Sequence, residues 1–231
     1  MALLDYFLPL SCSRCHRLVE TVCFDCLNQL EIVRQPLSGD PTITVVARFG
    51  YFTDLIKELI VRLKYLDQPW LGSVLGQTLL ADIVQLNPVD YCLPVPMTAT
   101  RRLERGYNQA KLLARASPCS KIDHLFIRLP SQRQAALSAE ERHNLAQVFD
   151  WRQPIPDWLA GSSVLIIDDV LTTGATVSRL VERLRQAKVK EIQVLVLALA
   201  EPTTDHWPES EVALITQNSG QDWFDQLAGK I

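Results

Sequence analysis

VLIIDDVLTTGAT, residues 164–176, places an apolar run, a pair of acids and a glycine-containing turn in one short stretch. The apolar run, residues 164–167, contains only β-branched residues and leucine, without polar alternation. Such a run is typical of a strand buried on both faces, as in a parallel sheet. Asp168 and Asp169 follow where that strand is expected to surface, and residues 177–184 then repeat apolar side chains at helical spacing. The stretch therefore predicts a strand, an acidic pair, a turn and a helix, in that order.

The turn at residues 172–176 is expected to bind an anion. The N-terminus of the following helix presents unpaired backbone N–H groups and the positive end of the helix dipole. Thr172, Thr173 and Thr176 add hydroxyl donors, and Gly174 allows close approach to the backbone. The two carboxylates do not suit an anion; they suit hydroxyl groups, or a metal ion beside the anion. A ribose 5-phosphate would use both the acidic pair and the turn, through its hydroxyl groups and its phosphate. The alternative is an ordinary strand–turn–helix with a capping threonine and two acids at the strand end.

Length and composition limit the class of protein. The chain has 231 residues and a net charge of −3, with 48% hydrophobic and 21% charged residues. This length suits one domain with an appendage or two small domains, and the composition is ordinary for a globular protein. The slightly acidic balance does not indicate nucleic-acid binding by the whole molecule. No apolar run reaches the length of a membrane span, and the start MALLDYFLPLSC lacks the basic region of a signal peptide, so we expect a cytoplasmic protein.

Four cysteines near the N-terminus, Cys12, Cys15, Cys23 and Cys26, form the pattern C-x2-C-x7-C-x2-C. Two close pairs of thiolates can surround one tetrahedral Zn²⁺, so a structural zinc site is the favoured interpretation. Three alternatives remain open. CSRCH (12–16) matches a haem-attachment pattern, the cysteines can form two disulfides, and a single C-x-x-C can be a redox motif. The lack of an export signal and of a βαβ context disfavours them.

Apolar patterning along the rest of the chain predicts further elements. Residues 27–42 have the composition of a linker, with Pro36, Gly39, Asp40 and Pro41. Beyond it we expect strands at residues 43–51, 89–95, 122–129, 148–151 and 192–199, and helices at residues 55–65, 71–86 and 177–187. Cys92 and Cys119 are interpreted as packing residues. No feature gives residues 201–231 a role.

Two polar segments are candidates for binding an anionic substrate. Residues 94–96 read PVP at a strand end, and RRLERGYNQAKLLARA (101–116) opens a basic helix after them. This order repeats the strand, turn and helix of residues 164–184 and indicates a pyrophosphate site; a solvated basic helix start is the alternative. The long polar segment 131–145 suits a mobile lid, or a plain exposed hairpin. A lid would exclude water from a reaction in the site that it covers.

Residues 164–176 resemble, at every position, the phosphoribosyl pyrophosphate (PRPP) loop of type I phosphoribosyltransferases. To about residue 200 the chain is similar to the competence ComF family, whose motifs occur here in order: the four cysteines, LKY (63–65), PVP (94–96), RGYNQ (105–109), Q-x-x-L-x4-R-x-N (134–144) and the PRPP loop. The resemblance implies an α/β fold of the type I phosphoribosyltransferase class, with a mainly parallel sheet flanked by helices and a small N-terminal zinc knuckle. We expect a knuckle and linker at 1–42, a phosphoribosyltransferase-like domain at 43–200 and a C-terminal tail at 201–231.

The resemblance also implies roles for single residues. Asp168 and Asp169 would hold the ribose hydroxyls and, with Arg105, form the catalytic set, while Mg²⁺ would bridge the pyrophosphate and ribose oxygens of PRPP. PRPP would contact Asp168, Asp169, Val170, Leu171, Thr172, Thr173, Gly174, Ala175 and Thr176. The pyrophosphate and lid residues would be Lys64, Arg105, Gly106, Asn108, Gln109, Gln134, Arg142 and Asn144, with Leu137 in the lid motif.

Three positions depart from the patterns of these families. Thr172 stands where purine phosphoribosyltransferases place an aspartate as general base, so a purine acceptor is not expected. Ser131 replaces the usual threonine of the lid, which is a mild change. Lys188 follows the PRPP-loop helix where glycine is usual, and a left-handed backbone there would cost roughly 1 kcal/mol relative to glycine.

The implied function is PRPP binding in a phosphoribosyltransferase-like protein linked to uptake and processing of single-stranded DNA in natural transformation. Residues 98–145 contain nine Lys or Arg against four Asp or Glu. The DNA contacts expected in this basic segment are Arg101, Arg102, Arg105 and Lys111, although the same charge would serve PRPP. Two alternatives stay open: a PRPP-sensing regulatory module without catalysis, and a DNA-binding accessory without transferase activity. The expected partners are PRPP, single-stranded DNA and competence DNA-processing proteins; no feature identifies the acceptor of a transfer.

Overall fold

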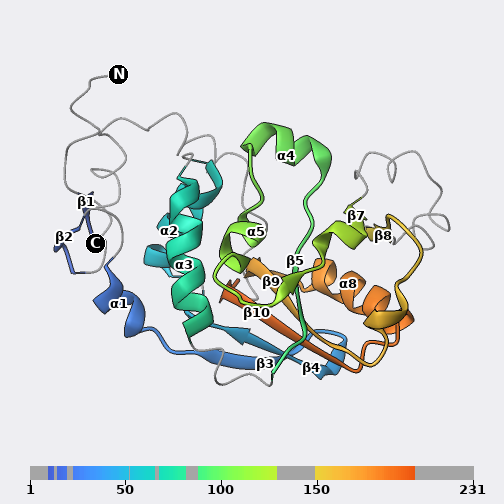
Figure 1. Cartoon of the computed structure of the whole chain (residues 1–231). Helices are drawn as coiled ribbons and strands as arrows, with labels where there is room; N and C mark the ends of the chain where they lie inside the picture. The colour runs from blue at the N-terminus through green and yellow to red at the C-terminus, as the bar shows by residue number, and fades with distance from the viewer. Residues whose placement is uncertain are drawn as a thin grey trace, which may run out of the picture. The chain divides into compact units, whose positions relative to one another are not determined.

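The computed structural model describes residues 10–12, 15–19, 23–51, 53–65, 68–81, 88–128 and 149–200. In this structure, residues 164–171 belong to a strand of a six-stranded sheet. Its central strand is β9 (Ser163–Leu171), with β10 (Glu191–Leu199) on one side and β5 (Tyr91–Pro94) on the other. The full order is β3-β4-β10-β9-β5-β6, where β3 is Val33–Leu37, β4 is Asp40–Ala47 and β6 is Ser120–Lys121. β3 is antiparallel to β4, and the other neighbouring strands are parallel. The expected mainly parallel α/β sheet is thus confirmed (Figure 1).

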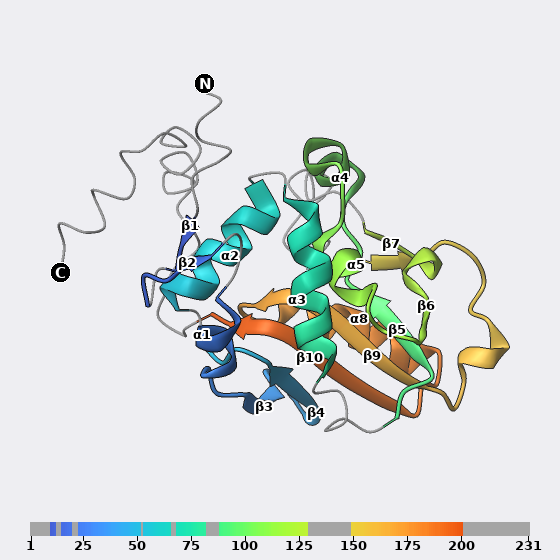
Figure 2. The ribbon, with the colours of Figure 1, turned by 60° about the vertical axis from the view of Figure 1, so that its left-hand side comes forward.

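Helices cover both faces of the sheet, as the unbroken apolar run of β9 requires. Leu165 and Ile167 lie in a core that includes α2 (Asp54–Tyr65), α3 (Pro69–Ala81) and α5 (Gln109–Ala114). Val164 and Ile166 lie in the opposite core, which includes α8 (Ala175–Gln186). In Figure 2, α3 crosses in front of the strands while α8 lies behind them. Because side chains alternate along a strand, the apolar run contributes to two cores at once.

Two glycines of α3 allow α5 to pack closely against it. A Cβ at Gly72 would lie 2.6 Å from Leu112 Cβ, and one at Gly76 would lie 2.3 Å from the carbonyl oxygen of Leu113. Both distances are too short for real atoms, so any larger residue would push the two helices apart. α5 begins within the RGYNQ motif (105–109), so this contact fixes where that motif lies.

β9 and the basic segment differ from the sequence-based expectation. β9 does not end before the acids; it continues through Asp168 and Asp169, because β10 keeps pairing with it as far as Leu171. The basic segment forms two helices, α4 (Ala99–Arg105) and α5, rather than one. Gly106 separates them with a φ of +74°, in the left-handed region that commonly ends helices.

The linker expected at residues 27–42 is wrong in its second half. Residues 33–37 form β3, which pairs with β4 through a turn at Gly39, where φ is +82°. Pro36 is tolerated because β3 is an edge strand, where proline need not break a ladder hydrogen bond. The proline and glycine that indicated a linker therefore belong to an edge strand and its turn. The division into 1–42, 43–200 and 201–231 stays a prediction.

Two shorter strands form a separate pair. β7 (Phe126–Arg128) pairs antiparallel with β8 (Phe149–Trp151), so the strand expected at 122–129 is shorter than predicted and lies outside the main sheet. One 3-10 turn, Asp123–Leu125, precedes β7, and another, Asp157–Leu159, precedes β9. The lid segment 131–145, the last residues of the helix expected at 71–86 and the tail 201–231 lie outside the described residues. Among the described helices, none is long and apolar enough to cross a membrane.

Lys188, at the position where the family usually has glycine, has a left-handed backbone with a φ of +58°. It lies just after the C-terminus of α8. There the N–H of Val189 donates to Leu184 O at 3.1 Å, and that of Lys188 donates to Arg185 O at 2.9 Å. This is the Schellman arrangement, in which glycine is the usual residue at the left-handed position.

We expect Lys188→Gly to raise the free energy of unfolding by about 1 kcal/mol, because glycine adopts this conformation without steric cost. Chemical denaturation measures the change. Lys190→Gly is the matched control, since the φ of Lys190 is not in the positive region and glycine gains nothing there. A Lys188→Gly variant less stable than the wild type would contradict the assignment of strain to this residue.

Candidate functional site

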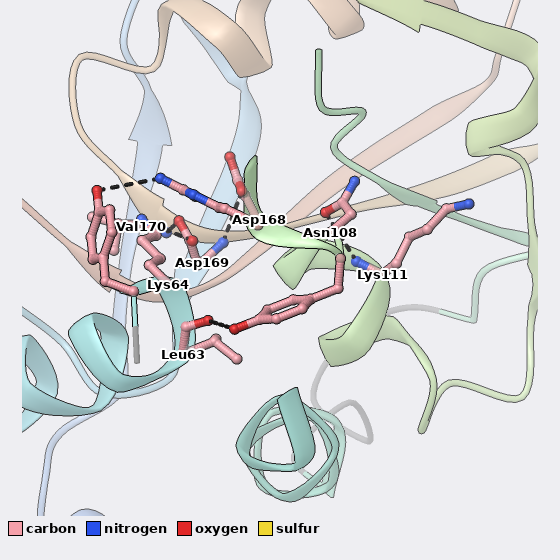
Figure 3. A network of polar contacts seen from close by, with 10 residues as sticks. Leu63, Lys64, Asn108, Lys111, Asp168, Asp169 and Val170 are labelled. Atoms are coloured by element: carbon pink, nitrogen blue, oxygen red, sulfur yellow. Dashed lines mark hydrogen bonds and ion pairs between the residues drawn. The ribbon is translucent and has the colours of Figure 1, made fainter. Parts of the chain in front are cut away.

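The two acids of β9 form the centre of the site. Asp169 is 8% exposed, and its Oδ2 lies 2.8 Å from the Nζ of Lys64 near the end of α2. Asp168 is half-buried, and its Oδ1 accepts a hydrogen bond from the backbone N–H of Asp169 at 2.9 Å. Figure 3 shows Lys64 next to Asp169. The structure thus brings the LKY lysine to the PRPP-loop acids, although the two motifs are far apart in the sequence.

Burial makes Asp168 reluctant to ionise. Desolvation and the charge of Asp169 raise the pKa of Asp168 to about 7, against the opposing positive charges of Lys64 and Arg128. A carboxyl group whose pKa lies near neutrality is typical of functional sites. Arg128 was not indicated by any motif, and its Nη1 donates to Pro96 O at 3.3 Å, in the loop that follows β5. Its position at the end of a predicted strand, directly before the lid segment, is the signal that could have found it.

Each residue of the LKY motif contacts another part of the site. The carbonyl oxygen of Leu63 accepts a hydrogen bond from the Tyr107 hydroxyl at 2.7 Å. The Tyr65 hydroxyl accepts one from Arg105 Nη2 at 3.3 Å, and the Arg105 guanidinium lies 4.9 Å from the centre of the Tyr65 ring. Together with the ion pair of Lys64, these contacts connect the end of α2 to both the RGYNQ motif and the PRPP loop.

The two amide side chains of the RGYNQ motif differ in their contacts. Asn108 Oδ1 caps α5 by accepting from the N–H of Lys111 at 3.4 Å, and its Nδ2 donates to Val95 O at 3.0 Å. Gln109 is 3% exposed, and its Nε2 has no hydrogen-bond partner among the described residues. Lys111 Nζ lies 2.7 Å from Asp123 Oδ2, which neutralises one of the four cations expected to contact DNA.

The turn that was predicted to bind an anion connects β9 to α8, and Gly174 is the N-terminal cap residue of α8. Gly174 has a φ of +77°, and a Cβ there would lie 3.1 Å from Leu37 Cδ1. The N–H of Ala175 makes only a long hydrogen bond, 3.4 Å, to Thr173 Oγ1, and the first N–H groups of any α-helix lack partners within the helix. Leu171 is part of the core, so its side chain cannot contact a ligand. Of the other loop side chains, Thr172, Thr173 and Ala175 are exposed, and Val170 and Thr176 are half-buried.

The remaining predicted site residues fall into two groups. Arg101 and Arg102 are exposed on α4, a helix without buried residues, and Gly106 forms the break between α4 and α5. The lid residues Gln134, Arg142 and Asn144 lie outside the described residues, so their part in the site stays a prediction.

The four predicted metal ligands lie together. Cys12 and Cys15 are in the turn of a hairpin formed by β1 (Leu10–Ser11) and β2 (Leu18–Val19). Cys23 is the N-terminal cap of α1 (Phe24–Asn28), and Cys26 lies within that helix. The four sulfur atoms are all within 4.8 Å of one another. An ion pair between Arg17 and Asp25 also joins the hairpin to α1.

The separation of the sulfur atoms fits a tetrahedral metal ion. Sulfur atoms bound to Zn²⁺ at about 2.3 Å stand about 3.8 Å apart in a tetrahedron. The Sγ atoms of Cys15 and Cys23 are 3.6 Å apart. Three of the four cysteines are buried, in one core with Leu27 and Phe49, so the cluster is continuous with the interior.

The thiols of the cluster differ in acidity. A backbone hydrogen bond from Arg17 lowers the pKa of Cys15 to about 7, whereas burial raises the pKa of Cys26 to about 12. A buried thiol of this kind becomes a thiolate when a bound cation supplies the compensating charge. The chemistry of the donor set therefore also fits a metal site.

Comparison with known proteins agrees with this geometry. Residues 130–229 match the phosphoribosyl transferase domain family. Competence protein F of Haemophilus influenzae is 29% identical over 207 residues, which cover 82% of this chain and 90% of that protein. Competence protein ComFC of Bacillus subtilis is 27% identical, over 68% of this chain and 63% of that protein. DNA utilization protein YhgH of Escherichia coli O157:H7 is 27% identical, over 80% of this chain and 87% of that protein.

One solved structure similar to the chain is that of the allosteric regulatory enzyme of purine biosynthesis, with 18% identity and a TM-score of 0.35. The alignment covers 67% of this chain and 32% of the enzyme, so the chain spans about a third of the enzyme's length. The chain is thus similar to competence protein F and ComFC over most of its length, and its residues 130–229 match the phosphoribosyl transferase domain family.

Proposed function

We propose that the chain binds PRPP with Mg²⁺ at the carboxyl ends of β5 and β9, as a phosphoribosyltransferase-like protein in the handling of single-stranded DNA. The observation that carries the proposal is that the LKY motif contacts both of the other motifs. Lys64 pairs with Asp169 of the PRPP loop, and Tyr65 accepts a hydrogen bond from Arg105 of the RGYNQ motif. Ligands of open α/β sheets bind at the carboxyl ends of the strands, which is where these groups lie. The names of the relatives, two competence proteins and a DNA utilization protein, support the part that concerns DNA.

The site offers a separate group for each part of PRPP. Asp168 and Asp169 would accept hydrogen bonds from the ribose hydroxyls, and the turn at 172–176 would hold the 5′-phosphate at the N-terminus of α8. Lys64 and Arg105 are the cations that suit the pyrophosphate. Mg²⁺ usually keeps several waters and takes few protein ligands, so PRPP can bring it without a dedicated cage of side chains.

Titration of the chain with PRPP and Mg²⁺ tests binding, and release of pyrophosphate in the presence of a cell extract or a nucleotide panel tests transfer. Binding with release identifies a transferase and its acceptor class. Binding of PRPP without release of pyrophosphate supports the PRPP-sensing alternative. If PRPP does not bind, the DNA-binding accessory is the remaining alternative. Purine bases are not expected to act as acceptors, because Thr172 cannot serve as a general base near neutral pH.

The cysteine cluster would hold a structural Zn²⁺. Cys12, Cys15, Cys23 and Cys26 would fill all four positions of a tetrahedron, which leaves no open position for zinc chemistry. Because Cys12, Cys23 and Cys26 share a core with α2, the metal would fix the N-terminal segment against the helix that carries Lys64.

Single-stranded DNA binding is a second candidate function, and the position of α4 favours it. None of the seven residues of α4 is buried, and Leu103 is 86% exposed. Arg101 and Arg102 are therefore free to meet phosphates. Tyr65 is 38% exposed and its ring lies beside Arg105, so α2 brings an aromatic side chain on which a base can stack. The sequence of the basic segment alone did not contain this aromatic.

Single-stranded DNA is expected to bind weakly and with a strong dependence on salt. If about three to four phosphates are contacted, log affinity should fall with log salt at a slope of about −2 to −3, roughly −0.7 per phosphate. Arg101→Ala with Arg102→Ala should weaken binding and make the slope shallower by about 1.4. PRPP should compete, because both anions would meet Arg105. Fluorescence anisotropy of a labelled oligonucleotide measures all three effects.

Lys190→Ala is the control for that experiment, since Lys190 is exposed at the amino end of β10, away from the carboxyl ends of the strands. Its affinity and slope should stay close to those of the wild type. If the affinity for DNA does not depend on salt concentration, or if Arg101→Ala with Arg102→Ala leaves it unchanged, α4 is not the DNA site.

A further inference from the structure

We propose that Tyr107 is a positioning residue of the PRPP site, whose hydroxyl group fixes the last turn of α2 so that Lys64 lies at the acids of β9. The inference rests on the proposed binding of PRPP. It gives a role to the tyrosine of the RGYNQ motif, the one residue of that motif for which no contact with PRPP is expected. Tyr107 is half-buried between α4 and α5 and packs against the core that contains α2.

The end of α2 is held at the carbonyl group of Leu63. The Tyr107 hydroxyl donates to Leu63 O at 2.7 Å (Figure 3). Leu63 is the third residue from the end of α2, and the last four carbonyl groups of an α-helix have no partner within the helix. The side chain of Leu63 is fully buried, and its Cδ1 would lie 3.2 Å from a Cβ at Gly72 of α3. Both the backbone and the side chain are therefore held directly before Lys64.

The segment that contains Tyr107 is itself anchored to the sheet. Asn108, the next residue, donates through Nδ2 to Val95 O at 3.0 Å. The N–H of Val95 in turn donates to Ile167 O of β9 at 2.9 Å. Two hydrogen bonds therefore connect the residue after Tyr107 to the strand that contains the acids.

The contacts of Tyr107 and Lys64 close a ring on β9. From Tyr107 the ring passes to Leu63, the neighbour of Lys64, and Lys64 Nζ lies 2.8 Å from Asp169 Oδ2. The ring leaves β9 at Ile167 and returns to it at Asp169, two residues further along the strand. A lysine side chain is long and flexible, so the position of its ammonium group depends on a fixed backbone. Loss of the Tyr107 hydroxyl would open the ring and let the end of α2 move relative to the acids.

Arg105 also contacts the end of α2, but it is less suited to hold it. Its Nη2 donates to the Tyr65 hydroxyl at 3.3 Å in an exposed position, whereas the bond from Tyr107 is 2.7 Å long and partly buried. A hydrogen bond shielded from water is electrostatically stronger than an exposed one. Arg105 is moreover expected to contact the pyrophosphate, so Tyr107 is the group that can hold α2 while PRPP is bound.

Titration calorimetry of the full chain with PRPP and Mg²⁺ tests the proposal through a double-mutant cycle. Tyr107→Phe removes one oxygen atom and is expected to weaken binding about 3- to 10-fold, and Lys64→Gln about 10- to 100-fold. If Tyr107 acts through Lys64, then Tyr107→Phe added to Lys64→Gln should weaken binding further by less than about twofold. A role in the fold alone would give the same loss with and without Lys64.

Tyr91→Phe is the matched control. Tyr91 is also half-buried, but it begins β5 and so lies at the opposite end of that strand from the PRPP site. Its substitution should leave the affinity for PRPP unchanged. Hydrogen exchange in the last turn of α2 should be faster in Tyr107→Phe than in the wild type, and unchanged in Tyr91→Phe, because the first substitution alone releases Leu63 O.

Wild-type affinity in Tyr107→Phe would overturn the inference while leaving PRPP binding intact. An equal loss of affinity with and without Lys64 would overturn it as well. So would a Tyr107→Phe chain that does not fold, since the hydroxyl would then support the whole fold rather than the position of Lys64. A wild-type chain that does not bind PRPP removes the proposed function and this inference with it, and that result is seen before any substitution is made.

Discussion

Replacement of both loop acids, Asp168→Asn with Asp169→Asn, is expected to abolish measurable PRPP binding while the chain stays folded. A charged acceptor of a ribose hydrogen bond contributes on the order of 1.5–3 kcal/mol, which is about 10- to 150-fold in affinity. Two such losses at one sugar should weaken binding by roughly a hundredfold or more, even if neighbouring effects are not additive. Titration calorimetry measures the change, and wild-type affinity in the double variant would refute the assignment of the acids.

The substitution at position 168 should not harm the folded state. The pKa of Asp168 rises from 3.8 to about 7 on folding, so between these values the folded chain binds more protons than the unfolded chain. Stability therefore declines as pH rises through this window and stays low above it. Asp168→Asn removes that penalty, and above about pH 7 its melting temperature should equal or exceed that of the wild type.

Two further variants separate binding from folding in this experiment. Asp169→Asn lacks the ion pair with Lys64 and is the variant in which some loss of stability is expected. Asp157→Asn, at an exposed carboxylate of the second 3-10 turn, makes the same change of charge as either single loop substitution and should bind PRPP normally. An equal loss of affinity in Asp157→Asn would show that net charge, rather than the loop acids, controls binding.

Local patterns were sufficient to predict the part of the fold that carries the PRPP loop. The unbroken apolar run specifies a strand with two buried faces, and Gly174 permits the positive φ of the turn. The spacing of Val177, Leu180, Val181 and Leu184 specifies the buried face of α8. Each of these signals acts within a few residues, so the surrounding sequence contains all the information that the element needs.

The contacts that complete the site were not predictable in the same way, because they join segments that are far apart. Lys64 meets Asp169 only because α2 packs on the sheet with its last turn near the carboxyl end of β9. β7 pairs with β8 instead of joining the main sheet, and Arg128 at its end donates to Pro96 O; no periodicity in the sequence indicates either contact. The extension of β9 past its acids likewise depends on β10, its partner strand.

Removal of the metal from the cysteine cluster is expected to unfold the N-terminal segment and to destabilise the core behind it. Structural Zn²⁺ bound by small modules contributes an apparent free energy of about 10–16 kcal/mol near neutral pH. Residues 10–28 are too few to bury a core of their own. Three of the cysteines pack in one core with Phe49 and α2. If removal of the metal displaces them, the packing of the helix that carries Lys64 should loosen as well. Elemental analysis should give about one zinc per chain, and a chelator should lower the melting temperature.

Cys23→Ser is the variant that tests the metal site most sharply, because Cys23 is 4% exposed and begins α1. Cys119→Ser is its matched control: Cys119 is half-buried outside the cluster, where its Sγ donates to Val89 O at 3.3 Å. Hydrogen exchange in residues 10–28 should rise in Cys23→Ser and after chelation, and stay unchanged in Cys119→Ser. Acid should release the metal, because protons compete for the thiolates and burial raises the pKa of Cys26. A metal-free chain with reduced cysteines and an unchanged melting temperature would show instead that the four sulfur atoms pack together without a metal.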